Sequence, residues 1–455
     1  MKWVACTAPD GQLLWAARTR EEPDRISDTV IDTDGDSIWT GYLLKSGALR
    51  LGKFESKTLR KQASLEMAFE PTTVSSPYVF LMSGDHPESD LQISAVQPVG
   101  DSLRVALFSR DLRIIFNKLY GIATPLLDKA SQTVPEPYLA PLPDRSGYYL
   151  CAWHRPGGDT KAAPAVAIVR LDNSGTLKWA NTYSLGNSTQ QSGPRVTEDG
   201  AILISAMRSD ARSHKTLLAK VSPDGAVNWA TTIDGVNGGP PDLHMHADPY
   251  RFTSPHLLVG GPSQYAKDGF YSVLLALNYE TGKIEKQLKF AAPGAVMFAQ
   301  KRGNSFYAAF SNQTISLHPV YRAALLKFDF DFNLLAARRI REPASRFPGF
   351  RLLPGGSGLV WYSYSSKPTM FLETINENLE SPDSCQWLDK DTFTFSKSTV
   401  QQQPLEVITA PFTSITVSDV NVKTTEADVT LFPFDLKEAP CNPGDSKVAP
   451  DKSGR

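Results

Sequence analysis

The feature that most constrains the fold is a hairpin-like unit that occurs twice between residues 165 and 235. Each copy has an apolar run, a turn containing Gly, and a second run with Trp four residues after that Gly. The pairs are Gly175 with Trp179, and Gly225 with Trp229. Alternating apolar residues around a short Asp/Asn/Ser/Gly turn are typical of a β-hairpin. A hairpin that recurs about every 50 residues indicates a repeat architecture, so we expect an all-β fold, a β-propeller.

Other parts of the chain carry weaker copies of the same unit. The N-terminal segment has Gly11 and Trp15 in the same relative places, whereas Lys286 stands where Trp stood in the central copies. Downstream the signature erodes to polar turns alone. Eight blades follow from turns near residues 11, 56, 110, 174, 225, 282, 332 and 377. Seven blades are the alternative, if residues 78–120 or the tail do not form one.

The two ends of the chain complement each other. A chain of 455 residues would suggest two or three domains, but repeats can form a single ring. The N-terminus has a hairpin, Trp3 to Thr19, without preceding strands, and the tail has strands without a following hairpin. We expect this hairpin to share a sheet with tail strands beyond Gln401, which would close the ring and protect its edges. The prediction is one propeller over residues 1–440 and a polar C-terminal tail over 441–455.

Two segments resemble repeats of a known kind. LDNSGTLKWANTY and VSPDGAVNWATTI are similar to the repeats of secreted bacterial β-propellers and to the tryptophan-docking repeats of quinoprotein-like propellers. The resemblance implies a propeller outside the cytoplasm and implies no reaction, because propellers carry unrelated functions. At Trp15, Trp179 and Trp229 the regular placement favours docking between blades, a structural role, over ligand stacking.

One stretch has the composition of a metal site. His244, His246 and Asp248 alternate, so on a strand all three would lie on one face. Imidazoles and a carboxylate suit zinc or another divalent ion. The alternative, which we favour, is a polar strand or loop after a Gly-rich segment, because no second group of ligands is evident.

A second acidic stretch, DTDGD at residues 32–36, resembles part of a calcium loop. The Glu that would complete such a loop is missing, and a plain β-turn is the better interpretation. The sequence also has no P-loop, no dinucleotide fingerprint and no nucleophile elbow. We therefore predict no cofactor.

The cysteines suggest where the protein works. Cys6, Cys151, Cys385 and Cys441 form no CxxC pair, which argues against a zinc or thioredoxin-type site. Cys385 and Cys441 both lie in polar, turn-rich surroundings that flank the tail, and we predict a disulfide between them. Such a bond persists outside the reducing cytoplasm, in the periplasm, at the cell surface or in the medium.

Charge and hydropathy limit the classes of partner that the chain is expected to bind. A formal net charge of −1 gives no bias toward nucleic acid or anionic membranes, and no apolar run is long enough to span a bilayer. We expect a monomer that binds or scaffolds a protein or glycan ligand without catalysis. The alternative is a carbohydrate-active hydrolase or lyase with acidic residues on loops at the axial channel, whose paired carboxylates would be distant in sequence.

Overall fold

A computed structural model gives the structure of the chain. It describes residues 3–433 except 8–12, 20–29, 34–35, 45, 70–77, 83–91, 123–136, 155–162, 189, 192–193, 210–213, 235–255, 264–270, 291–294, 303, 312–323, 330, 341–348, 353–357, 364–369, 381–387, 391–394, 398–400 and 413–414.

The described residues form an all-β fold, as the alternating pattern predicts, and none of them lies in a helix. The strands pair antiparallel in eight sheets, which we number 1 to 8 in chain order. Sheet 1 contains β1 (Trp3–Thr7), β2 (Leu13–Thr19) and β36 (Leu431–Pro433), and sheet 2 contains β3 (Val30–Thr33), β4 (Ser37–Leu43), β5 (Ala48–Glu55), β6 (Lys61–Ala68) and β35 (Thr424–Thr425). Sheet 3 contains β7 (Tyr78–Met82), β8 (Gln92–Val99), β9 (Ser102–Phe108), β10 (Ile114–Tyr120) and β34 (Val417–Asp419). Sheet 4 contains β11 (Tyr138–Pro141), β12 (Tyr148–His154), β13 (Ala165–Leu171), β14 (Leu177–Ser184) and β33 (Ile408–Pro411).

Sheets 5 to 8 complete the set. Sheet 5 contains β15 (Gln190–Gln191), β16 (Arg195–Val196), β17 (Ile202–Ser209), β18 (His214–Val221), β19 (Val227–Asp234) and β32 (Gln402–Pro404). Sheet 6 contains β20 (His256–Ser263), β21 (Tyr271–Asn278), β22 (Ile284–Phe290) and β31 (Phe395–Lys397), and sheet 7 contains β23 (Ala295–Arg302), β24 (Ser305–Ser311), β25 (Ala324–Asp329), β26 (Leu334–Ile340) and β30 (Leu388–Lys390). Sheet 8 contains β27 (Gly349–Leu352), β28 (Gly358–Ser363) and β29 (Met370–Ile375).

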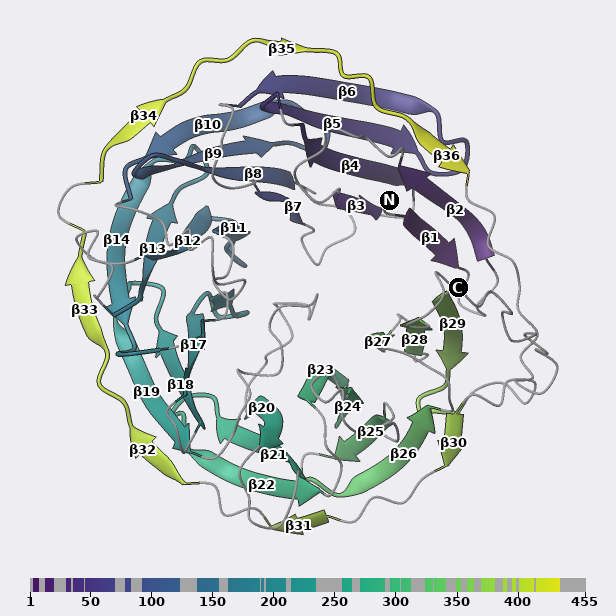
Figure 1. Ribbon diagram of the computed structural model, residues 1–455, viewed down its shortest axis with the longest axis vertical. Helices are drawn as coiled ribbons and strands as arrows, with labels where there is room; N and C mark the ends of the chain where they lie inside the picture. The colour runs from purple at the N-terminus through teal and green to yellow at the C-terminus, as the bar shows by residue number, and fades with distance from the viewer. Residues whose placement is uncertain are drawn as a thin grey trace, which may run out of the picture.

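The sheets follow one another in chain order around a ring (Figure 1). The first strands of neighbouring sheets contact each other on its inner side: β1 with β3, β3 with β7, β7 with β11, β20 with β23 and β23 with β27. Successive strands of each sheet then run outward. Sequence neighbours are therefore also spatial neighbours, within a sheet and from one sheet to the next.

Sheet 4 has two buried faces because it packs between sheets 3 and 5. On β13, Ala167 and Val169 pack toward sheet 3, and Val166 and Ile168 pack toward sheet 5. All four side chains are fully buried. A strand covered on both faces needs a continuous apolar run, which explains why AVAIV precedes the first strong turn. The core therefore consists of layers between sheets, with no single centre.

Glycines in the turns let neighbouring sheets approach closely. The N–H of Gly225 bonds to the carbonyl of Ser222 at 2.9 Å, with a left-handed φ of 90°. A Cβ on Gly225 would lie 2.8 Å from Asn181 Nδ2 of sheet 4, and one on Gly282 would collide with the ring of Trp229 in sheet 5. Gly thus satisfies both the backbone conformation and the contact with the preceding sheet.

The turn geometry survives where the sequence signature erodes. Leu59, Leu112, Phe332 and Leu379 occupy the left-handed position of their hairpins, with φ values of 56°, 61°, 63° and 60°. Their N–H groups bond back to the start of the turn, as the glycines do. Leu112, Phe332 and Leu379 are buried, so packing offsets the strain of a left-handed side chain. The eroded hairpins are therefore structurally equivalent to the central ones.

The described residues of the C-terminal segment 388–433, which we call the belt, run back around the outside of the ring (Figure 1). Its seven short strands, β30 to β36, pair antiparallel with the outer strands of sheets 7, 6, 5, 4, 3, 2 and 1 in that order. The expected pairing of the N-terminal hairpin with the tail is present, since β36 places Pro433 opposite Ala17 of β2. Contrary to expectation, the tail does not supply only the missing part of one sheet; it adds an edge strand to seven.

Candidate functional site

Two of the repeated tryptophans connect neighbouring sheets through their indole N–H groups. Trp179 of β14 donates to the carbonyl of Pro223, in the β18–β19 turn of sheet 5, at 3.2 Å. Trp229 of β19 donates to the carbonyl of Tyr279, in the β21–β22 turn of sheet 6, at 3.0 Å. Trp229 is only 8% exposed, and Trp179 is half-buried against Tyr149. Both indoles therefore lie at the boundary with the next sheet.

Trp15 lies at a different boundary. It is half-buried and packs on the cluster between sheets 1 and 2 that includes Ile38 and Phe54. It is thus another aromatic residue between sheets.

Two further aromatic residues make the same connection from a different strand, and the sequence analysis missed them. Trp39 of β4 donates to the carbonyl of Arg110 in sheet 3 at 3.1 Å, and the Tyr307 hydroxyl of β24 donates to the carbonyl of Glu377 in sheet 8 at 3.0 Å. Each acceptor directly follows the first residue of its turn, as Pro223 does. Trp39 also lies four residues after a Gly in the sequence, a signal that could have identified it.

Cations on the third strands face these aromatic rings. Trp39, Tyr149 and Tyr307 are directly opposite a cation on the adjacent strand of their own sheet. The nitrogens or guanidinium carbons lie 5.5–5.8 Å from the ring centroids, a cation–π distance. The three cations are Lys53, Arg170 and Lys327.

Lys220 occupies the equivalent place in sheet 5, where the ring comes from the next sheet instead. On β17 the residue opposite Lys220 is Leu203, which has no aromatic ring. The Nζ lies 3.5 Å from the ring centroid of Tyr279 in sheet 6. Lys220 is 1% exposed, which makes it the most buried charged residue among those the structure describes. A buried ammonium needs compensating charge.

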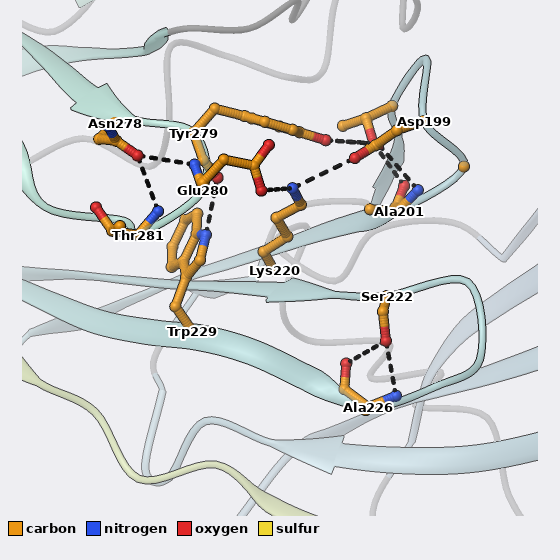
Figure 2. Close-up of polar contacts among 12 residues, drawn as sticks. Asp199, Ala201, Lys220, Ser222, Ala226, Trp229, Asn278, Tyr279, Glu280 and Thr281 are labelled. Carbon is orange, nitrogen blue, oxygen red and sulfur yellow. Dashed lines mark hydrogen bonds and ion pairs between the residues drawn. The ribbon is translucent and has the colours of Figure 1, made fainter.

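Two carboxylates supply that charge from opposite sides (Figure 2). The Nζ of Lys220 lies 3.3 Å from Asp199 Oδ2, in the loop before β17, and 3.3 Å from Glu280 Oε2, in the turn after β21. The Tyr279 hydroxyl lies 2.7 Å from Asp199 Oδ1 and 2.7 Å from Thr197 Oγ1. These five residues are the candidate site, and they come from two sheets.

Burial and hydrogen bonds shift the pKa values of Asp199 and Tyr279 in opposite directions. Burial favours the neutral form of Asp199, but hydrogen bonds from Thr197 and Tyr279 favour the carboxylate. The ammonium of Lys220 acts in the same direction, so the pKa of Asp199 lies below its usual value. Burial raises the pKa of the Tyr279 phenol well above its usual range.

The cluster is consistent with a connection between sheets rather than with acid–base chemistry. A phenol with a raised pKa stays protonated at neutral pH and donates to Asp199, so it is a poor general base. The ammonium of Lys220 lies between two carboxylates and over a ring, which leaves no open position for a substrate beside Nζ. The arrangement joins the loop before β17 to the turn after β21.

The remaining predicted site residues lie elsewhere. Outside the described residues are His244, His246, Asp248, Cys385 and Cys441. Of the acidic stretch at 32–36, Asp36 accepts a backbone hydrogen bond from Ser56 through its carbonyl, at 2.9 Å. Within the described ranges no group of three or more His, Cys, Asp or Glu is placed to hold a metal ion. Cys151 is buried in the layer between sheets 4 and 5.

Comparisons with known proteins add little. No protein-family model matches the chain, and no curated protein matches its sequence. Among solved structures, the crystal structure of polysaccharide lyase Uly1 is similar with a TM-score of 0.31 and 8% identity, covering 76% of this chain and 89% of that one. In the part of the chain that the structure describes, no helix is long and apolar enough to cross a membrane.

Proposed function

We propose that the chain is an eight-bladed β-propeller that acts outside the cytoplasm as a rigid platform for a protein or glycan ligand, without catalysis. Each of the eight sheets would be one blade. The observation that carries the proposal is the repeated docking of aromatic side chains onto the turns of the next sheet, at Trp39, Trp179, Trp229 and Tyr307. A frame fixed at these four boundaries presents its loops in a constant arrangement, which lowers the entropy lost when a ligand binds.

The position of the belt supports binding at the faces of the ring. Belt strands occupy the outer edges of seven sheets, so these edges are not available for pairing with a ligand strand. The ends of the strands and their connections form the two faces, and ligand-binding residues concentrate on such loops.

The extracytoplasmic location rests on the sequence. The resemblance to secreted propellers and the expected disulfide between Cys385 and Cys441 both favour it. Mass spectrometry of digested, unreduced protein from an oxidising compartment tests the bond. A linked peptide pair supports the location, and two alkylated thiols contradict it.

A binding assay with a turnover control tests the function. The full chain is applied to arrays of neutral and acidic polysaccharides and of surface proteins, and each bound glycan is then incubated with the protein in solution. We expect saturable binding with no new reducing ends and no unsaturated products. Release of either product contradicts the binding proposal and favours the hydrolase or lyase alternative. The variant H244A/H246A, with and without added zinc, tests whether the histidine stretch contributes.

A further inference from the structure

The belt contacts the ring as a bound peptide would. Its strands are two to four residues long, and the first three begin at Leu388, Phe395 and Gln402, seven residues apart. Seven residues span at most about 23 Å, which is an upper limit on the distance between neighbouring outer strands along this part of the rim. The belt crosses these strands in reverse chain order, from sheet 7 to sheet 1. One belt strand therefore corresponds to one sheet.

Apolar side chains anchor the belt at the boundaries between sheets. Leu405 packs on the layer between sheets 4 and 5, Phe412 on that between sheets 3 and 4, and Val422 on that between sheets 2 and 3. Val429, only 5% exposed, belongs to the cluster of sheets 1 and 2. By contrast Ile408, between two anchors, is 64% exposed. The four named anchors therefore lie at four successive boundaries between sheets, so the spacing of apolar residues in the belt corresponds to the spacing of these boundaries along the rim.

Side chains of the outer strands hold the belt backbone. The Asn117 amide donates to the carbonyl of Val420 at 2.7 Å, and the Thr231 hydroxyl donates to the carbonyl of Gln403 at 3.1 Å. The Nζ of Lys61 forms an ion pair with Glu426 at 2.7 Å. Backbone pairing that supplies affinity, with side-chain sites that supply specificity, is the mode of β-strand addition to a sheet edge.

We propose that the rim of the ring is a β-strand acceptor surface and that residues 388–433 are its ligand, able to bind from a second copy of the chain as they bind here within one. The rim recognises an extended segment with apolar anchors at the four boundaries between sheets 1 and 5. This surface is separate from the faces assigned to the ligand above, so the two proposals stand or fall independently.

A strand-exchange experiment tests the proposal on the folded full chain. A site for a specific protease is inserted between Glu380 and Ser381, so that Cys385 and Cys441 stay on the same fragment, and the chain is cut after folding. A fluorescent peptide of residues 388–433 is then added in excess, and native mass spectrometry follows the release of the original fragment. The control peptide carries L405S, F412S and V429S. We expect the native peptide to replace the fragment and the control to compete at least about a hundredfold less well.

Each outcome decides the question. Equal exchange of both peptides would show that the anchors are not recognised and would overturn the proposal. So would a fragment that stays bound, without exchange, up to the denaturant concentration at which the ring itself unfolds. Loss of the ring's near-ultraviolet circular dichroism as soon as the fragment departs would likewise show that the belt belongs to the core fold. Replacement with retained dichroism supports the acceptor surface.

Discussion

Lys220 is buried, whereas its two carboxylate partners stay in contact with water: the side chains of Asp199 and Glu280 are 48% and 70% exposed. Removal of the lysine leaves carboxylates that water can solvate, while removal of the carboxylates leaves a buried charge without compensation. We expect K220M to lower the free energy of unfolding by about 1 kcal/mol or less, and D199N/E280Q to lower it by more than about 3 kcal/mol. Denaturant unfolding measures both.

The control for this comparison is Lys178, which forms a surface pair with Asp172 and is 54% exposed. K178M should change the free energy of unfolding by less than about 0.5 kcal/mol. Equal losses in K220M and D199N/E280Q would contradict the asymmetry.

Gly282 is constrained by its neighbour as well as by its own backbone. Its φ is 67°, and an added Cβ would collide with the ring of Trp229. Gly186 has a φ of 80° with nothing within 4 Å of such a Cβ, so it isolates the backbone cost. We expect G186A to cost about 1 kcal/mol and G282A about 3 kcal/mol in thermal unfolding. Similar losses would show that Trp229 moves aside freely.

His154 gives the stability a pH dependence. It is 2% exposed beside Phe412, neither ring nitrogen has a hydrogen-bond partner among the described residues, and burial lowers its pKa to about 4. An unfolded histidine has a pKa near 6.5, so the unfolded state binds more protons between these values, and stability is full above pH 6.5 and falls toward pH 4. We expect the parent to lose about 2 kcal/mol more than H154F between pH 7 and pH 5. Parallel losses in the two proteins would exclude His154 as the source.

At the scale of single elements, the sequence predicts the hairpins better than it predicts their side chains. The turn at Asp172 to Gly175 is identifiable because Gly and Trp stand at fixed offsets. The turn at Leu112 has the same backbone conformation but cannot be recognised from the sequence. A buried leucine replaces Gly, and the indole that docks on this turn, Trp39, comes from another strand. Which strand supplies the aromatic ring depends on cross-strand register, which one hairpin does not encode. The cluster around Lys220 was missed for a different reason: Glu280 comes from a separate sheet, and one hairpin does not indicate which turn of the next sheet it will contact.

Leu379 tests the balance between strain and packing in an eroded turn. It is 1% exposed at a φ of 60°, whereas Leu59, at 56°, is half-buried. Glycine relieves about 1 kcal/mol of left-handed strain at either position, but it removes roughly 2–3 kcal/mol of burial at Leu379 and only about 1 kcal/mol at the half-buried Leu59. We expect L379G to be destabilised by about 1–2 kcal/mol and L59G to be near neutral, as measured by urea unfolding. A stabilised L379G would mean that strain outweighs burial.

At the scale of the whole molecule, the sequence predicts the all-β class and the meeting of the two chain ends but not the path of the belt. Val417 to Asp419 and Thr424 to Thr425 are too short to show a period, and their partners β10 and β6 lie about 300 residues or more away in sequence. Strands this short are recognised only through the edge that they cover. The outer strands that the belt covers are seven or eight residues long, and their sequences have the pattern of ordinary final strands of a repeat. Nothing in that pattern indicates that a further strand pairs with them.

The belt's contribution to stability can be measured by graded truncation. A chain ending at Pro404 lacks β33 to β36, which uncovers the outer strands of sheets 1 to 4 but leaves β30 to β32 on sheets 5 to 7. Uncovered edge strands have unpaired backbone groups that favour association. We expect a lower melting temperature, concentration-dependent self-association in sedimentation, and faster hydrogen exchange in β6, β10 and β14 than in β19 and β22. A chain ending at Pro433 keeps every described strand but lacks Cys441, so it should behave as the parent does when both proteins are reduced. If the shorter chain melts with the parent and stays monomeric, the belt covers the rim without stabilising it, and the closure of the ring depends on the contacts between sheets alone.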